Sequence, residues 1–251
     1  MNNSQKEQIF KPLTDDIFHF SCHRGISCFT ECCAKLRLIL TPYDIVRMKN
    51  RLKLSSDQFL HDYTETVIDK HGRFPMVKLK MNNDTKGTCP FVIREGCTIY
   101  EDRPEACRLY PIGRASAMVN DEKNAHNKFF MVTESHCRGF REKEVWTLNE
   151  WLNHEGVKEY AEMNDPWLGI VTSSKTLGSK AHIPQKHQMF FMASYNLDKF
   201  REFIFKSNFF DRFQVGAELK NRLESDDVSL MRFSFDWLRF SLFGEKTIQI
   251  K

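Results

Sequence analysis

Apolar residues recur at helical spacing through most of the C-terminal part of the chain. From Glu144 to Met163 apolar side chains repeat every three or four positions, and the same period returns in shorter segments further on. The stretch from Asp165 to Ile183 carries glycines and serines without such a period, so we expect a loop there. The pattern predicts helices over 144–163, 184–192, 197–205, 215–223 and 227–243.

The N-terminal part of the chain has shorter apolar runs separated by turn residues. Leu36 to Leu40 is typical of a strand or of a helix end, and Phe74 to Met81 is typical of a strand. Between them, Thr41 is expected to cap a helix whose first position is Pro42, since a missing N–H is tolerated there. A second short helix is expected to begin near Ser55.

All eight cysteines lie between Cys22 and Cys137, and the 114 residues that follow Cys137 contain none. This distribution predicts a cysteine-rich metal-binding domain over residues 1–140 and a helical region over residues 141–251 packed on it. Apolar residues make up 41% of the chain, enough for a packed core. The predicted fold is therefore α+β and helix-dominated.

The expected compartment decides how the thiols are interpreted. The N-terminus lacks the apolar core of a signal peptide, and no apolar run approaches membrane length. We therefore expect a cytoplasmic protein with reduced thiols and no membrane partner. A formal net charge of +4 is too weak to indicate a general nucleic-acid binder, so no nucleic-acid partner is expected.

The cysteines fall into two groups of four along the chain, and reduced thiols in such groups indicate metal ligands. No C-x2-C spacing occurs, which argues against zinc ribbons, C2H2 fingers, thioredoxin-like motifs and the bacterial ferredoxin run. In the second group, Asp102 is expected to cap a short helix that Pro111 ends. The predicted ligands are Cys22, Cys28, Cys32 and Cys33, followed by Cys89, Cys97, Cys107 and Cys137.

Cys32 and Cys33 are adjacent, and this bears on the kind of metal centre. Neighbouring side chains diverge in a strand and in a helix alike, so two successive thiols reach two metal atoms more easily than one tetrahedral ion. The pair favours a polynuclear centre or two neighbouring sites. The alternative is one ligand beside a buried free cysteine.

Four arginines lie within a few residues of cysteines and are candidate cofactor-binding residues. Their charge lowers thiol pKa values and offsets anionic thiolates. They also suit an anionic substrate or surface ion pairs, and the sequence leaves these roles open. They are Arg24, Arg103, Arg108 and Arg138.

The segments around the cysteines resemble the YkgJ-type cysteine-cluster family, which is described as a putative zinc- or iron-chelating domain. The resemblance covers roughly residues 18 to 140. The first motif is wider here, because five residues separate Cys22 from Cys28 where the family often has two. A similar module occurs in flagellin lysine methylases, which are associated with an iron–sulfur cluster. The matching segments are Cys22…Cys28…Cys32-Cys33, Leu40 to Ile45, Cys89-Pro90-Phe91, Cys97 to Arg108, and Tyr110-Pro111.

These observations predict an iron–sulfur protein, with a 4Fe–4S cluster or another polynuclear centre, in a redox or cluster-dependent modifying role. A structural zinc-binding interaction module and a metal trafficking or sensing protein are the alternatives. The chain has no G-x-G-x-x-G, P-loop, H-E-x-x-H or G-x-S-x-G motif. The sequence therefore does not decide whether the protein is an enzyme. It also leaves open the substrate, the oligomeric state and the identity of the protein or small-molecule partner.

Overall fold

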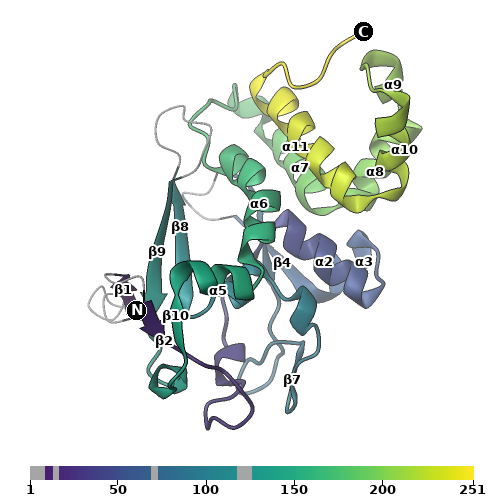
Figure 1. Ribbon diagram of the computed structural model, residues 1–251. Helices are drawn as coiled ribbons and strands as arrows, with labels where there is room; N and C mark the ends of the chain where they lie inside the picture. The colour runs from purple at the N-terminus through teal and green to yellow at the C-terminus, as the bar shows by residue number, and fades with distance from the viewer. Residues whose placement is uncertain (1–8, 14–16, 69–72, 118–125) are drawn as a thin grey trace. The chain divides into compact units, whose positions relative to one another are not determined.

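The computed structural model describes residues 9–13, 17–68, 73–117 and 126–251 (Figure 1). The fold is mixed α+β, with about 50% helix and 16% strand, so the predicted helix-dominated α+β class is confirmed. Packing divides the chain into two compact units, each built from two segments. Unit 1 comprises residues 1–38 and 80–162, and unit 2 comprises residues 39–79 and 163–251. The domain boundary after residue 140 stays a prediction.

Short antiparallel pairings in unit 1 join the first described residues to segments far along the chain. The hairpin of β8 (Ile112–Ala117) and β9 (His126–Val132) accepts β1 (Phe10–Pro12) on the β9 edge. Strand β2 (Ile17–His19) pairs with β10 (Val145–Thr147), which places Phe18 opposite Trp146. None of these strands is predicted by the sequence pattern, because their apolar runs are short and their partners are remote.

The remaining elements of unit 1 are very short. The predicted cap at Asp102 is wrong, because Asp102 lies inside a 3-10 turn and the helix begins after Pro104, whose extended backbone serves as its N-cap. The helix ends at Leu109, before Pro111, as predicted. The elements are η1 (Glu31–Cys33), β6 (Val92–Ile93), β7 (Gly96–Cys97), η2 (Tyr100–Asp102), α4 (Glu105–Leu109), η3 (Gly139–Arg141) and α5 (Leu148–His154).

The core of unit 1 is aromatic. The rings of Phe20 and Trp151 meet edge to face with centroids 5.5 Å apart. The indoles of buried Trp151 and partly buried Trp146 each have a hydrogen-bond partner: Trp151 Nε1 donates to the Leu109 carbonyl at 3.0 Å, and Trp146 Nε1 donates to the Phe20 carbonyl at 2.9 Å. Cys137 packs against the same cluster. The core therefore holds β2, α4, α5 and one cysteine loop together.

Two helices of unit 2 begin where the sequence predicts. Thr41 is the N-cap of helix α2 (Pro42–Leu52), and Ser55 is the N-cap of α3 (Ser56–Tyr63), each with a reciprocal capping box. The predicted strand from Phe74 to Met81 is also found, as the central strand β5 (Met76–Leu79) of the unit 2 sheet. That sheet has the order β3 (Ile39–Leu40), β5 and β4 (Thr64–Val67).

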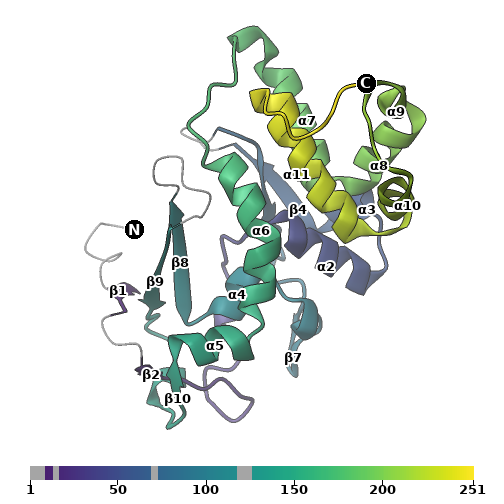
Figure 2. The ribbon, with the colours of Figure 1, turned by 45° about the horizontal axis from the view of Figure 1, so that its top comes forward.

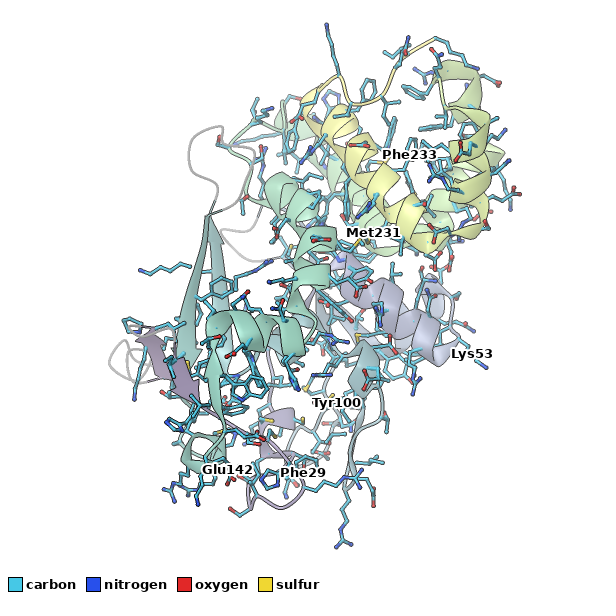
Figure 3. The ribbon with its side chains drawn as sticks, in the orientation of Figure 1. Phe29, Lys53, Tyr100, Glu142, Met231 and Phe233 are labelled. Carbon is cyan, nitrogen blue, oxygen red and sulfur yellow. The ribbon has the colours of Figure 1, made fainter. Side chains whose placement is uncertain are left out.

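The predicted C-terminal helices of unit 2 are also confirmed. Helices α7 and α11 lie side by side in both ribbon views (Figures 1 and 2). Met231 and Phe233, labelled on α11 in Figure 3, are buried in this helical region. The helices are α7 (Ile183–Tyr195), α8 (Leu197–Lys206), α10 (Ala217–Ser225) and α11 (Asp227–Phe243), with two unpredicted short elements, η4 (Lys180–His182) and α9 (Phe209–Arg212).

Two predictions around residue 160 need correction. The predicted helix 144–163 begins instead with strand β10, because this segment pairs with β2, and only then forms α5. The predicted loop from Asp165 is helical as far as Val171, since α6 (Val157–Val171) runs through Pro166. Trp167 and Ile170 are each only 1% exposed. Their burial outweighs the helix-breaking tendency of the proline.

Candidate metal centre

The first cysteine loop leaves β2 and folds into successive tight turns. The amides of Phe29, Glu31 and Cys33 each donate to the carbonyl three residues earlier, at 3.0 to 3.1 Å. Thr30 and Lys35 both have left-handed backbone, with φ of 68° and 55°, and they flank the turn that carries the adjacent cysteines. Left-handed backbone at non-glycine residues is held only where surrounding contacts impose it. The two sulfurs of Cys32 and Cys33 are 4.0 Å apart.

A short antiparallel bridge fixes this loop to the second cysteine segment. Ala34 pairs with Thr88, and the Cys89 amide donates to the Cys33 carbonyl at 2.8 Å. On the other side of the bridge, the Lys35 amide donates to the Gly87 carbonyl at 2.8 Å. This register places Cys33 opposite Cys89, so their side chains belong to the same face.

Cys89 and Cys97 are neighbours across a tight hairpin. Cys97 lies in β7 opposite Val92, and the Thr98 amide donates to the Phe91 carbonyl at 2.8 Å. Gly96 supplies the turn with φ of +122°, which side chains rarely adopt. The thiols of Cys89 and Cys97 interact electrostatically. Cys107 lies further along, in α4, and is partly buried.

Cys137 joins the first group of cysteines in space, although it belongs to the second group along the chain. The Arg138 amide donates to the Cys28 sulfur at 3.1 Å, and the Ser21 amide donates to the Gly139 carbonyl at 3.2 Å. The Cys137 thiol interacts electrostatically with Cys28 and Cys32, and the Cys22 thiol interacts with all three. The fold therefore gathers Cys22, Cys28, Cys32 and Cys137.

Gly139 is required for this close approach, and we expect Gly139→Ala to disturb the site. A Cβ here would lie 2.7 Å from the Ser21 carbonyl oxygen and 2.7 Å from the Phe20 ring. The variant should lose about 1–3 kcal/mol of stability and bind less metal, because the loop must move away from Cys22. Unfolding midpoints and the metal-to-protein ratio measure both effects.

Gly169→Ala is the matched control. Gly169 lies within α6, where an added Cβ would find Arg239 Nη2 at an ordinary 3.7 Å. This substitution should leave the metal content unchanged and the helix slightly more stable. Equal metal content in the Gly139→Ala protein and the wild type would contradict the role given to this glycine.

Backbone N–H groups point at several of the sulfurs. The amides of Phe91 and Val92 hydrogen-bond to the Cys89 sulfur, the Ile99 amide to Cys97, and the Gly139 amide to Cys137. Burial raises the pKa of all three thiols, and these N–H groups act in the opposite direction. Such donors stabilise a thiolate more than a thiol, as a metal ligand requires.

The thiols also raise one another's pKa. Burial, followed by Cys32, Cys28 and Cys137, raises the pKa of Cys22 to about 11. The pKa of Cys32 is raised first by its contact with Cys33 and then by burial. Mutual repulsion of thiolates is relieved by a bound cation, so the donor set fits a soft metal such as zinc or iron. Within the described ranges, no three His, Cys, Asp or Glu side chains are already spaced to hold one metal ion.

Two of the candidate arginines are buried in contacts with the protein itself. Arg103 is 8% exposed, pairs with the Glu155 carboxylate and stacks 3.7 Å above the Tyr100 ring. Arg108 is equally buried and donates to the carbonyls of Arg103, Glu101 and Glu155. These contacts fasten the segment between Cys97 and Cys107. That Arg103 and Arg108 bind a cofactor or an anion stays a prediction.

The other two candidate arginines, Arg24 and Arg138, are exposed. His23, between Cys22 and Arg24, lies 3.5 Å from Glu142, which is labelled in Figure 3. Sequence reasoning missed Glu155, the buried partner of Arg103, because it lies in a distant segment without a motif of its own. It also missed the buried pair of Arg114 with Glu105 at 3.2 Å. Charged residues inside the otherwise apolar cysteine motif were the available signal.

The gathered thiols define a cysteine-rich metal-chelating domain. Residues 21–141 match the CxxCxxCC family model, whose description is a putative zinc- or iron-chelating domain. The resemblance predicted from the sequence is confirmed, and with it metal binding through a cysteine cluster. Comparison with curated proteins and with solved structures gave no match. No helix among the described residues is both long enough and apolar enough to cross a membrane.

Proposed function

We propose that the eight thiols hold an iron–sulfur centre that serves redox chemistry or a cluster-dependent modification. The carrying observation is that adjacent Cys32 and Cys33 have different cysteine neighbours. Cys32 interacts with Cys22 and Cys137, whereas Cys33 lies opposite Cys89. A single tetrahedral ion binds four ligands, so it would leave half of the eight cysteines connected through Cys32 and Cys33 without a metal. A polynuclear centre, or two neighbouring centres, uses both halves of this set of cysteines.

The proposed ligands form two sets. One set is Cys22, Cys28, Cys32 and Cys137, which interact with one another. The other is Cys33, Cys89 and Cys97, to which we add Cys107 as the remaining cysteine of the module. An iron–sulfur cluster held by such thiolates would supply one-electron chemistry. The chain's contribution is to present backbone N–H groups to the sulfurs and to exclude water from most of them.

Access to the centre supports a chemical role over a purely structural one. Cys22 is exposed, whereas the other cysteines are buried or partly buried. Tyr100, labelled in Figure 3, is 53% exposed and interacts electrostatically with Cys22. The exposed Arg24 and Arg138 follow cysteines of this set and suit an anionic substrate or an acidic partner protein. We place this chemistry in the reducing cytoplasm, where thiols stay available for metal.

A structural zinc module is the second candidate function. The amide-to-sulfur hydrogen bonds and the internal engagement of Arg103 and Arg108 favour it, because closed zinc sites need no open position. Metal analysis separates the two functions. Anaerobically purified protein should be brown, with iron, acid-labile sulfide and a broad band near roughly 400 nm. A colourless protein with stoichiometric zinc and no sulfide would overturn the proposal.

Single serine variants test the division between the adjacent cysteines. Cys32→Ser and Cys33→Ser should each lower the iron-to-protein ratio by roughly half, because each removes a ligand from a different set. Ser27→Ala, an exposed change in the same loop, should leave the ratio unchanged. Full iron retention in Cys33→Ser beside loss in Cys32→Ser would show that only one of the pair is a ligand.

A further inference from the structure

Tyr110 has a buried hydroxyl that the fold leaves without a conventional partner. Tyr110 follows α4, and its ring packs edge to face on Phe20, with centroids 5.8 Å apart, in the core of unit 1. Its hydroxyl is buried and makes no hydrogen bond of standard geometry with any described residue. A buried polar group without a partner costs about 1–3 kcal/mol, so such a group in a packed core needs a reason.

The side chain that interacts with this hydroxyl is Cys137. Cys137 packs against the same core cluster as Tyr110, and its sulfur is the acceptor within the hydroxyl's surroundings. A tyrosine hydroxyl, with an ordinary pKa of about 10, is protonated at neutral pH and is therefore a donor. A neutral thiol is a weak acceptor, whereas a metal-bound thiolate is a strong one.

We propose that Tyr110 is a positioning residue that donates its O–H to the Cys137 sulfur when that sulfur binds metal. The inference rests on the proposed function in one respect, since it takes Cys137 as a ligand. Metal binding then supplies the acceptor that the hydroxyl lacks. A hydrogen bond to a ligand sulfur orients the ligand, strengthens metal binding and, in an iron–sulfur centre, raises the reduction potential.

Tyr110→Phe tests the proposal because it removes the hydroxyl and keeps the ring in the core. We expect metal affinity, measured by chelator competition on the full chain, to fall by about 10- to 100-fold. We also expect the reduction potential of the iron-loaded variant to fall. The hydrogen bond to the sulfur stabilises the reduced, more negatively charged centre, and the variant lacks this bond. A merely structural hydroxyl would not shift the potential of a folded protein.

Tyr195→Phe is the matched control in unit 2. Its hydroxyl is also buried, and it donates to a sulfur that is not a proposed metal ligand, that of Met76 at 3.7 Å. This variant should keep wild-type affinity and potential. Unchanged affinity and potential in Tyr110→Phe would overturn the proposal. Loss of hydrogen-exchange protection in β9 of the metal-loaded variant would assign the hydroxyl to folding and would overturn it too.

The same measurements keep this inference separate from the proposed function. If the wild-type protein holds zinc and no iron, the iron–sulfur proposal fails, whereas the affinity comparison still decides the role of Tyr110. If the protein holds iron and Tyr110→Phe matches the wild type, only the inference about the hydroxyl fails.

Discussion

Removing the metal is expected to unfold unit 1 while unit 2 keeps its structure. Binding of a structural metal contributes on the order of 10 kcal/mol to folding. Unit 1 depends on that contribution, because its cysteine segments contain only two-residue strands, three-residue turns and the short helix α4. Ordering such segments costs about 1–2 kcal/mol per residue in backbone entropy. Its buried apolar cluster is small, with Phe20 and Trp151 at its centre.

Unit 2 has its own means of stability. Helix α11 alone buries Leu230, Met231, Phe233, Trp237 and Leu238, among others, and α2 and α3 have full capping boxes. Hydrogen exchange followed by mass spectrometry, before and after chelation in the presence of a thiol reductant, distinguishes the two units. We expect protection to disappear in β9 and α5 and to remain in α11.

Two comparisons support this measurement. Adding the metal back should restore protection in β9, which excludes irreversible damage to the thiols. Cys107→Ser should show part of the same effect, with lower metal content and lower solubility. Protection that survives complete metal removal in β9 would mean that the core folds unit 1 without help from the cysteines.

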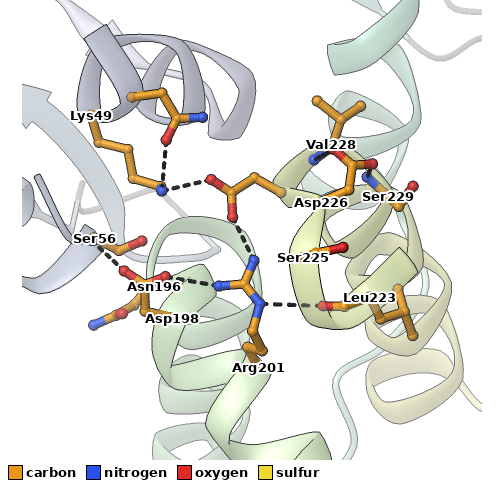
Figure 4. Close-up of polar contacts among 12 residues, drawn as sticks. Lys49, Ser56, Asn196, Asp198, Arg201, Leu223, Ser225, Asp226, Val228 and Ser229 are labelled. Carbon is orange, nitrogen blue, oxygen red and sulfur yellow. Dashed lines mark hydrogen bonds and ion pairs between the residues drawn. The ribbon is translucent and has the colours of Figure 1, made fainter. Parts of the chain in front are cut away.

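Asp227→Ala is expected to lower the free energy of unfolding of unit 2 by about 3 kcal/mol. Asp227 accepts hydrogen bonds from Lys49 at 2.7 Å and from Arg201 at 2.5 Å (Figure 4). The Lys49 side chain is only 6% exposed, so removing the carboxylate leaves a buried ammonium group without its counter-charge. Arg201 also binds Asp198, which accepts from the Ser56 amide at 2.7 Å. The network therefore joins α2, α3, α8 and α11.

The matched control is Asp211→Ala, an exposed aspartate in α9. This surface change should stay within about 0.5 kcal/mol of the wild type. Exchange rates of the most protected α11 amides report the stability of unit 2 directly. An Asp227→Ala protein as stable as Asp211→Ala would mean that water or local rearrangement solvates Lys49 at little cost.

The stability difference between the wild type and Asp227→Ala is also expected to depend on pH. Burial acts to raise the pKa of Asp227, but hydrogen bonds from Lys49 and Arg201 outweigh it, so the pKa lies below its ordinary value. A depressed folded-state pKa gives stability that is present above the unfolded value of about 3.9 and is lost as pH falls through the folded value. The stability difference between wild type and Asp227→Ala should therefore shrink below about pH 4. A constant difference down to about pH 2 would contradict this origin.

The sequence alone determined those features that local chemistry controls. Thr41 and Ser55 cap helices because their hydroxyls reach amides within one turn, and the apolar period of 227–243 gives α11 its observed bounds. The cysteine motifs predict the match to the family model, because each motif is a short run of residues that are close together in the chain. None of these features needs a partner from a distant part of the chain.

Only the tertiary structure decided which groups meet. Cys137 lies beside Cys22 and Cys28 because β2 pairs with β10 and Gly139 fits against Ser21, and spacing along the chain contains neither fact. Likewise Arg103 proves to be buried against Glu155, a partner far along the chain. Such contacts depend on burial energy and on shape complementarity between segments that are far apart in the chain. Sequence patterns indicate only the local structure of each segment.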